Sequence, residues 1–363
     1  MDYPIRVLCV FSTLDRGGAE SMCMNIYRKI DRSKVQFDFV KHTSDIGAYE
    51  DEIIDLGGRV YEAPTYKLIN HFSYCAWWEN HFKNHTEHTI IHGHYFTIAS
   101  VYFRIAKKYN RITIAHSHAK AVDSKIKELM IRFLPEVSDY KLACSNEAGK
   151  WLYRGDSFVV LKNAIDLESY RFNPEIRNTY RENLGIDNKY VVGTVANFSK
   201  VKNPFGLIDL FDQVHKKCKR ACLLWVGDGG LRGEIEKRID EKGLSNHVIL
   251  LGTRSDVPQL LQAMDVFVLP SLSEGLGIAA IEAQAAGLPT ICSSNVPKEA
   301  AISPLCSHLA LNNLGIWVDT VLAQDVYKRD DSSNYIAESG YDVSRTSKWI
   351  ENFYCDIISN KLQ

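Results

Sequence analysis

The stretch Asp265–Pro289, DVFVLPSLSEGLGIAAIEAQAAGLP, contains the pattern that decides the fold of this chain. Its apolar residues Val266–Leu269 predict a buried strand, and a helix is expected to begin after the glycine-containing turn that follows. A further apolar run at Pro289–Cys292 predicts the next strand. A strand, a helix and a strand in this order form the unit from which parallel sheets covered by helices are built.

The same alternation extends along almost the whole chain, which predicts an α/β fold with two Rossmann-like units. Helices are expected, among other places, at Glu20–Ile30 and Phe96–Lys108. The strands expected in the first half are Arg6–Phe11, Phe37–Val40, Arg59–Tyr61, Thr89–His92, Ile112–His116 and Lys141–Ala143. Those expected in the second half are Tyr190–Val195, Ala221–Val226, Val248–Leu250, Val266–Leu269 and Pro289–Cys292.

The length of 363 residues is typical of two domains rather than one. We expect a first domain at residues 1–170, a linker at 171–188 and a second domain at 189–340. The linker belongs to a polar segment that contains Pro174 and has no sustained apolar periodicity. Residues 341–363 are expected to form a last helix that needs a partner surface. Its apolar stripe consists of Trp349, Ile350, Phe353, Tyr354 and Ile357.

The composition argues against several classes of protein. Lys and Arg number 43 against 44 Asp and Glu, and this balance, without a long basic run, argues against a nucleic-acid binder. The longest apolar stretches, such as Ala221–Val226, are far shorter than the roughly 20 residues that span a bilayer. The start of the chain does not resemble an export signal. The nine cysteines are scattered and lie mostly in apolar runs, which predicts reduced core thiols in the cytoplasm.

Two glycines, Gly17 and Gly18, lie between the first expected strand and the helix that follows it. Glycine lets a ligand approach the backbone closely, and the N-terminus of a helix favours an anion. The loop is therefore either a cradle for a phosphate group or a tight turn, and the glycines alone do not decide between these interpretations.

Glu274 and Glu282 lie at the helix entry of the segment quoted above. Their separation corresponds to about 80° around a helix, so the carboxylates are expected at two successive points along one ligand. They can accept hydrogen bonds from sugar hydroxyl groups while the N–H groups of Leu276–Ile278 hold a diphosphate. The alternative is a helix cap at Glu274 and a solvated Glu282. The apolar neighbours of Glu282 favour the functional interpretation.

Histidines follow two of the expected strands: His92 and His94 follow one, and His116 and His118 follow the next. The carboxyl ends of parallel strands form the edge where open α/β sheets bind ligands, so these side chains are candidate ligand contacts. A zinc site is the alternative. No carboxylate or cysteine completes an obvious ligand set in the sequence, so no metal is expected.

The segment Asp265–Pro289 resembles the E-x7-E donor-site motif of glycosyltransferase family 4, whose members have the GT-B fold. Further motifs in the same order along the chain are GGAE at Gly17–Glu20, HSHA at His116–Ala119, ACSNEAGKWLY at Ala143–Tyr153, KNAID at Lys162–Asp166, KNP at Lys202–Pro204, VGDGGLR at Val226–Arg232 and LGTRSDVPQLLQAMD at Leu251–Asp265. The resemblance implies two Rossmann-like domains that face each other across a cleft, with the last helix returning to the first domain. It places the donor in the second domain and the acceptor on the first.

The resemblance also implies three catalytic residues. Glu274 would bind hydroxyl groups of the donor sugar, Lys202 would pair with the departing diphosphate, and His116 would touch the sugar near the reacting carbon. Further donor-binding residues implied in this way are Gly17, Gly18, Asn197, Thr253, Arg254, Gly275, Leu276, Gly277, Ile278 and Glu282, the last on the ribose. The remaining histidines expected to contact the acceptor or the donor are His92, His94 and His118.

The function that the resemblance implies is a retaining hexosyltransferase. It would move a hexose or N-acetylhexosamine from a UDP-sugar to a glycan, carried on a polyprenyl diphosphate, during the assembly of a bacterial capsule, exopolysaccharide or O-antigen. No cofactor and no metal are expected. The sequence indicates neither the donor sugar and linkage nor an oligomeric state.

Two alternatives remain open from the sequence. One is a nucleotide-sugar epimerase with the same architecture, and the other is a catalytically inactive partner subunit. Asn197 supports the second, because family members usually have an arginine there, which leaves Lys202 and Lys200 as the cationic clamp.

Peripheral attachment to the cytoplasmic face of the membrane is also expected. The apolar residues Ile126, Leu129, Met130 and Phe133 recur at helical spacings in Val122–Leu134. The same stripe is compatible with a helix that packs on a sheet.

Overall fold

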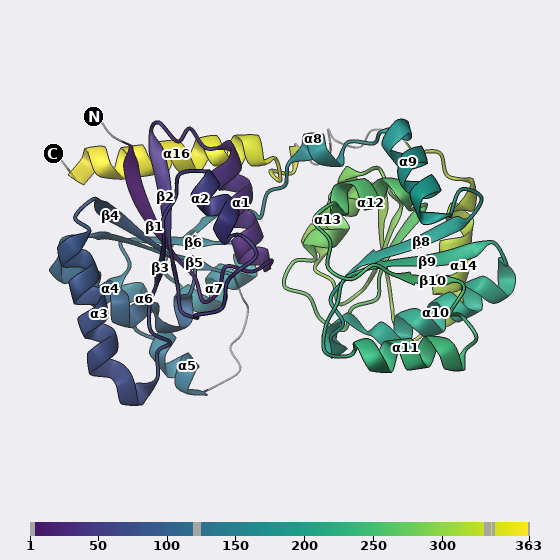
Figure 1. The fold of residues 1–363 in the computed structure, drawn as a ribbon, viewed down its shortest axis with the longest axis horizontal. Helices are drawn as coiled ribbons and strands as arrows, with labels where there is room; N and C mark the ends of the chain where they lie inside the picture. The colour runs from purple at the N-terminus through teal and green to yellow at the C-terminus, as the bar shows by residue number, and fades with distance from the viewer. Residues whose placement is uncertain (1–3, 119–124, 330–334, 336–337, 362–363) are drawn as a thin grey trace. The chain divides into compact units, whose positions relative to one another are not determined.

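The computed structural model describes residues 4–118, 125–329, 335 and 338–361, and for residues 125–127 and 361 it describes the backbone alone. Ala119 and residues 122–124, which belong to expected motifs, therefore lie outside the described residues. The chain divides into two compact units (Figure 1). The first unit is Met1–Ile165 together with Gly340–Gln363, and the second unit is Asp166–Ser339.

The first unit contains a seven-stranded parallel sheet in the order β3-β2-β1-β4-β5-β6-β7. Its strands are β1 (Ile5–Val10), β2 (Val35–Lys41), β3 (Val60–Glu62), β4 (His88–Gly93), β5 (Ile112–Ser117), β6 (Tyr140–Ala143) and β7 (Val159–Val160). The six strands expected here from apolar runs are all present within two residues. β7 was not expected, because two residues form too short a pattern to recognise.

Helices cover the sheet of the first unit. Its helices, with η for 3₁₀ turns, are α1 (Gly18–Lys29), α2 (Glu50–Asp55), η1 (Leu68–Asn70), α3 (His71–Asn84), η2 (Phe96–Ile98), α4 (Ala99–Lys108), α5 (Lys125–Ile131), α6 (Leu134–Val137), α7 (Asn146–Tyr153) and α16 (Val343–Lys361). The expected helix Phe96–Lys108 is thus a 3₁₀ turn followed by an α-helix.

The last helix, α16, packs on the first unit, as expected from its apolar stripe. Figure 1 shows α16 beside α1. The rest of the first unit ends at Ile165, so the chain passes through the second unit before it returns with α16. Ile350, Tyr354 and Ile357 are buried in one core with side chains of β1, β2 and α1. Burial of such side chains is the main source of helix stability in a protein. Trp349, at the edge of the stripe, remains 39% exposed.

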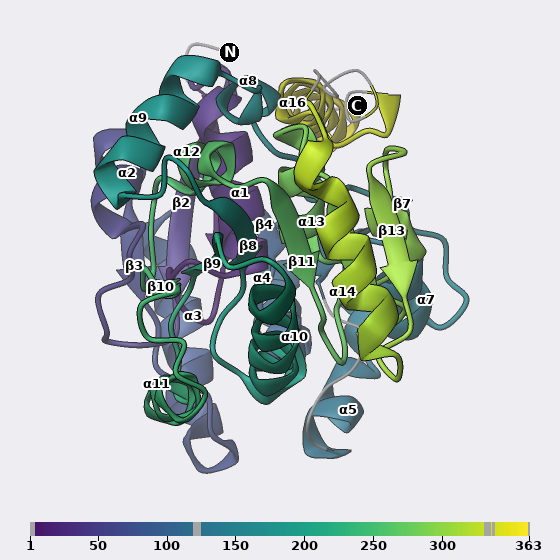
Figure 2. The same cartoon turned by 90° about the vertical axis from the view of Figure 1, so that its right-hand side faces the viewer.

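The second unit contains a six-stranded parallel sheet in the order β10-β9-β8-β11-β12-β13. Its strands are β8 (Tyr190–Val195), β9 (Ala221–Val226), β10 (Val248–Leu250), β11 (Val266–Leu269), β12 (Thr290–Ser293) and β13 (Cys306–Leu309). Its helices are α8 (Leu167–Tyr170), α9 (Pro174–Leu184), η3 (Lys200–Lys202), α10 (Pro204–Lys217), α11 (Arg232–Glu241), α12 (Val257–Ala263), α13 (Ile278–Ala285), η4 (Lys298–Ala300), α14 (Leu314–Ala323) and η5 (Gln324–Val326). Figure 2 shows α10 and α14 side by side on one face of this sheet.

The segment expected as a linker, 171–188, contains the helix α9 and falls within the second compact unit. Asn173 accepts hydrogen bonds from the N–H groups of Glu175 and Ile176 and so caps the helix. Arg177 and Arg181 then form ion pairs with Asp265 at the start of β11. The helix is fixed to the second unit by buried and half-buried cations, which produce no apolar periodicity in the sequence.

The structure contains no helix, among the residues described, that is long and apolar enough to cross a membrane.

Candidate active site

The candidate active site of the second unit lies at the carboxyl ends of β8 and β11. These two strands are neighbours in the sheet, and the strand order reverses between them. In open parallel sheets this reversal separates the loops and leaves room for a ligand. The loop after β8 leads to Lys202, and the loop after β11 contains Glu274.

Lys202 ends the turn η3, and the backbone around it is tied to the loop after β11. Asn203 adopts a left-handed conformation with φ 54°, and its amide donates a hydrogen bond to the carbonyl of Pro270 over 3.0 Å. The N–H group of Leu272 donates to the carbonyl of Val201 over 2.8 Å. These two hydrogen bonds hold the loops together independently of the contact between Lys202 and Glu274.

Lys202 and Glu274 meet directly. The ammonium group of Lys202 lies 2.6 Å from Oε1 of Glu274, and the hydroxyl group of Ser271 donates to the same oxygen over 2.7 Å. Glu274 is 8% exposed and Lys202 22% exposed, so the pair is only partly screened by water. No described residue donates a hydrogen bond to the other carboxylate oxygen of Glu274.

The alternative interpretation of Glu274 as a helix cap does not match the structure. The helix α13 begins at Ile278 and its N-cap is Gly277, so Glu274 belongs to the preceding loop. Gly277 has φ 85°, and a Cβ atom there would lie 2.9 Å from a methyl group of Val296. Glycine is therefore required at this position by the backbone itself.

The same loop presents unused hydrogen-bond donors. The backbone N–H groups of Gly275, Leu276 and Gly277 donate to no described residue, and Ile278 begins the helix. A Cβ atom at Gly275 would meet nothing within 4 Å, so packing within the unit does not require glycine there. Free N–H groups at a helix N-terminus next to a lysine form a binding place for an anion such as a phosphate.

Glu282 lies on α13, partly exposed and surrounded by apolar residues. The hydroxyl group of Tyr170 donates to its Oε1 over 2.8 Å. Burial raises the pKa of Glu282 from 4.5 to about 7, and the hydrogen bond from Tyr170 opposes this rise. Glu282 is thus not the solvated side chain of the alternative interpretation.

The remaining residues expected on the donor are exposed. Asn197 accepts a hydrogen bond from the hydroxyl group of Ser199 over 2.8 Å. Thr253 is exposed, and the guanidinium group of Arg254 forms a two-pronged ion pair with Asp256. Lys200, the second cation of the expected clamp, is exposed on η3.

In the first unit, Gly17 and Gly18 begin α1. Gly17 is the N-cap residue with an extended backbone, and the carboxylate of Glu20 folds back toward it. A Cβ atom at Gly18 would meet nothing within 4 Å, and neither glycine has a positive φ. The N–H group of Gly17 donates to the carbonyl of Asp15 over 2.8 Å, which is a turn within the loop, while the space in front of Gly18 is open. Both interpretations of the loop therefore remain predictions.

The four candidate histidines of the first unit form one stacked group at the ends of β4 and β5. His92 stacks on His94 with ring centres 4.2 Å apart, and His116 stacks on His118 at the same distance. Hydrogen bonds link His92 to His116 over 3.2 Å and His94 to His118 over 2.9 Å. The hydroxyl group of Tyr354 on α16 lies 2.7 Å from Nδ1 of His92.

Burial keeps these histidines neutral. It lowers the pKa of His92 and of His118 to about 3, and lowers the pKa values of His94 and His116 well below their usual range. His116 has no exposed surface, whereas His118 is partly exposed. Direct contact of His116 with a ligand stays a prediction, and this buried position does not favour it. His118 is the histidine of the group that a ligand can reach.

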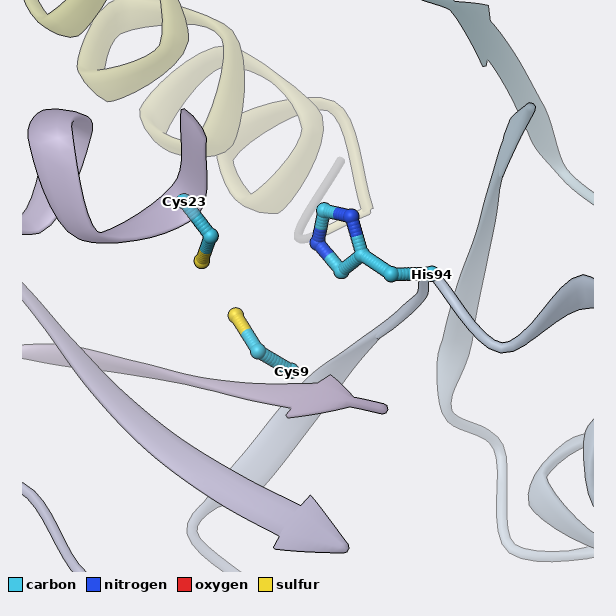
Figure 3. A group of neighbouring side chains, drawn as sticks. All are labelled: Cys9, Cys23 and His94. Atoms are coloured by element: carbon cyan, nitrogen blue, oxygen red, sulfur yellow. The ribbon is translucent and has the colours of Figure 1, made fainter. Parts of the chain in front are cut away.

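Two features of the site were not found from the sequence. Tyr170 lies 112 positions from Glu282, so no spacing pattern connects them. Cys9 and Cys23 lie beside His94 (Figure 3), although the sequence indicated no cysteine near the histidines. All nine cysteines are free thiols in this structure.

Comparison with known proteins identifies the family. The sequence model described as "Glycosyl transferases group 1" matches residues 176–302. The chain is 33% identical to the putative glycosyltransferase EpsF of Bacillus subtilis, over 96% of both chains. It is 27% identical to the Escherichia coli UDP-Gal:alpha-D-GlcNAc-diphosphoundecaprenol alpha-1,3-galactosyltransferase, over 56% of this chain and 55% of that one.

The fold also matches solved structures. HepE of Anabaena, crystallised in complex with UDP-glucose, superposes with a TM-score of 0.80 over 97% of this chain and 99% of that chain, at 20% identity. This likeness shows the fold, which is GT-B, as expected from the resemblance. The full-length match to EpsF and the family match to the second unit agree with it. The chain belongs to the group 1 glycosyltransferases.

Proposed function

We propose that this chain is a retaining hexosyltransferase that moves a hexose or N-acetylhexosamine from a UDP-sugar to a glycan carried on a polyprenyl diphosphate. The product would enter a bacterial surface polysaccharide. The observation that carries the proposal is the Lys202–Glu274 pair beside the free N–H groups of Gly275, Leu276 and Gly277.

The diphosphate of the donor is assigned to Lys202 and to the free N–H groups. When the diphosphate takes over Lys202, Glu274 is released to accept hydrogen bonds from hydroxyl groups of the sugar. In the absence of donor, the ion pair therefore holds the ammonium group of Lys202 and the carboxylate of Glu274 next to each other. Donor binding replaces this ion pair by contacts with the diphosphate and the sugar. A fixed cation also stabilises the negative charge that develops on the leaving diphosphate.

The nucleoside end of the donor is assigned to Glu282, whose carboxylate binds the ribose hydroxyl groups. Tyr170 positions this carboxylate. Thr253 and Arg254 remain proposed contacts of the base, and Asn197 of the phosphates. For the first unit, the proposal keeps Gly17 and Gly18 as contacts of the donor phosphates and replaces His116 by His118 as the histidine that meets the sugar.

The relatives support this choice of substrates. HepE was crystallised with UDP-glucose. The E. coli enzyme uses UDP-Gal and a GlcNAc-diphosphoundecaprenol acceptor, and its name gives an alpha-1,3 linkage. Because the sugar of UDP-galactose is itself α-linked, an α-linked product supports retention. Charge stabilisation by Lys202 and N–H groups needs no metal at the donor site, and none is proposed there.

A lipid-linked acceptor places the reaction at the cytoplasmic face of the membrane. The first unit presents three exposed apolar side chains in η1 and at the start of α3: Leu68 is 62%, Ile69 93% and Phe72 88% exposed. Leu129 and Phe133 of the expected membrane segment are also exposed, whereas Met130 packs against the core. We include peripheral membrane contact in the proposal, with Leu68, Ile69 and Phe72 as its first candidates. Loss of vesicle co-sedimentation in Ile69→Ser with Phe72→Ser would support them, and unchanged binding would exclude them.

The test is a panel of UDP-glucose, UDP-galactose, UDP-N-acetylglucosamine and UDP-N-acetylgalactosamine, incubated with and without a diphosphate-linked sugar acceptor on a short lipid. Release of UDP and the anomeric configuration of the product are followed by NMR. We expect one donor to give an α-linked product only when acceptor is present.

Other outcomes would contradict the proposal. Conversion of the donor sugar without acceptor would indicate the epimerase. Donor-dependent thermal stabilisation without turnover on any acceptor would indicate an inactive partner subunit. A β-linked product would exclude retention but leave the donor site unchanged.

A further inference from the structure

Cys9, Cys23 and His94 form a compact group of side chains in the core of the first unit. Cys9 lies on β1, Cys23 on α1 and His94 just after β4. One ligand atom from each, two sulfurs and one ring nitrogen, lie within 4.8 Å of one another. All three side chains are buried, with exposed fractions of 0%, 3% and 6%.

The topology of the sheet brings these residues together. Cys9 on β1 lies directly opposite His92 on β4, and the N–H group of His94 donates to the carbonyl of Val10 over 3.0 Å. Cys23 belongs to the buried face of α1, which packs over β1. The group is thus positioned by backbone hydrogen bonds and by a helix face, not by exposed loops.

The ring of His94 is oriented like that of a metal ligand. Its Nδ1 is hydrogen-bonded to His118 over 2.9 Å, and its ring stacks on Phe11 with centres 4.4 Å apart. Its Nε2 is buried and has no hydrogen-bond partner among the described residues. Figure 3 shows a ring nitrogen of His94 facing the sulfurs of Cys9 and Cys23. Metal-bound histidines have this arrangement, with one nitrogen on the metal and the other held by a neighbouring group.

We propose that the first unit binds one Zn²⁺ ion through Cys9 Sγ, Cys23 Sγ and His94 Nε2. Zinc accepts this combination of sulfur and nitrogen ligands, and a water molecule fills the fourth position. The two thiols lose their protons to solvent on binding, so two thiolates and a neutral imidazole cancel the charge of the ion. A site without net charge is the one that a buried position tolerates best.

The required movement is small. Bond lengths of about 2.3 Å to sulfur and 2.1 Å to nitrogen place tetrahedral ligand atoms about 3.5–3.8 Å apart. The present separations of up to 4.8 Å therefore close by about 1 Å through side-chain rotation. The ion would link α1, which begins at Gly18, to β1 and to the histidine group. The site is separate from Lys202 and Glu274, so its test does not depend on the proposed function.

The experiment uses the full chain, purified without a metal-binding tag and treated with chelator. Surface His71 and Cys75 have a nitrogen and the sulfur 3.6 Å apart and could bind metal adventitiously, so a Cys75→Ala background is used beside the wild type. We expect one equivalent of Zn²⁺ per chain, competition by Co²⁺ with thiolate charge-transfer absorbance, and an X-ray absorption signal of two sulfur and two nitrogen or oxygen ligands. Zinc should also raise the melting temperature.

Cys23→Ala and His94→Phe should each weaken zinc binding by about 100-fold or more, since direct ligands matter more than the groups behind them. His94→Phe keeps an aromatic ring that can stack on Phe11. It therefore tests the site even if the Cys23 variant does not fold. Cys292→Ala is the matched control, because Cys292 is buried and lies 4.0 Å from the sulfur of Cys306. It should bind zinc as the wild type does.

Three results would overturn the proposal. One is absence of stoichiometric zinc binding in the wild type. Another is binding that survives both Cys23→Ala and His94→Phe. The third is a Cys9–Cys23 disulfide found by thiol counting in protein prepared under reducing conditions. Binding of Cu⁺ but not Zn²⁺ would overturn the assignment of the metal.

Discussion

The two units have the same type of parallel sheet but place different chemistry at the carboxyl ends of their strands. In the second unit the loops after β8 and β11 bring together Lys202 and Glu274, a charged pair. In the first unit the segments after β4 and β5 bring together three buried histidines and the partly exposed His118, and burial lowers the pKa values of all four. The topology decides where a ligand can bind, and the side chains decide which ligand. A diphosphate is negatively charged and therefore requires a positively charged group such as that of Lys202.

The largest effect is expected from removal of α16, which should unfold the first unit and leave the second folded. Ile350, Tyr354 and Ile357 are buried in the first core, and burial of each contributes roughly 1.5–3 kcal/mol. Together they approach the total stability of an ordinary domain, about 5–15 kcal/mol. Truncation before Val343 should give rapid amide exchange in peptides of residues 4–165 and slow exchange in those of residues 189–329. A soluble, fully active truncation would contradict this.

Lys202→Ala should lower kcat by about 10²–10³-fold, because the charge on the leaving diphosphate loses a fixed cation. Steady-state kinetics with saturating donor and acceptor measures this. A rise in KM with unchanged kcat would show instead that Lys202 only binds the ground state. Lys200→Ala, which removes an exposed cation of the same turn, is the control and should have a much smaller effect.

Glu282→Ala should weaken binding of the UDP-sugar by about 10- to 150-fold, the range for a hydrogen bond to a charged group of roughly 1.5–3 kcal/mol. Calorimetric titration measures the affinity, and circular dichroism verifies that the fold is intact. Donor affinity equal to that of the wild type would exclude Glu282 from the ribose contact.

The smallest effects concern pH and Tyr170. The pKa of Glu282 is raised to about 7, so its carboxylate is ionised above pH 7 and protonated below it. Donor affinity should therefore fall as the pH decreases through 7, and should be flat in Glu282→Gln. UDP-glucose is the suitable probe, because it lacks the terminal phosphate that titrates near pH 6.

Tyr170→Phe should move this midpoint upward, since the hydroxyl group of Tyr170 favours the ionised carboxylate. The loss of affinity at pH 7 should be only a few-fold. A midpoint identical to that of the wild type would show that Tyr170 does not act through Glu282.

Much of the fold could be predicted because short apolar runs of neighbouring residues are enough to indicate its central strands. Runs such as Tyr190–Val195 are apolar enough to mark a strand to the residue. The helix α9 could not be predicted in this way, because Arg177 and Arg181 hold it through Asp265, more than eighty positions away. The edge strand β13 is half-buried and therefore lacks the apolar pattern of the central strands.

The candidate site was predictable only in part for the same reason. The ends of two expected strands identified the four histidines as candidate ligand contacts, but their stacking and the burial of His116 depend on packing that no spacing shows. The family resemblance pointed to Lys202 and Glu274 separately. Their direct contact depends on Asn203 and on the hydrogen bond between Leu272 and Val201, which only the folded backbone provides.

The measurement that tests the central claim most directly is the affinity of UDP relative to uridine, in the wild type and in Lys202→Ala. The two ligands differ only by the diphosphate, which we assign to Lys202 and to the N–H groups of Gly275, Leu276 and Gly277. We predict that Lys202→Ala reduces the preference for UDP by about 10- to 150-fold and leaves the affinity for uridine unchanged. An unchanged preference for UDP in the variant would contradict the account.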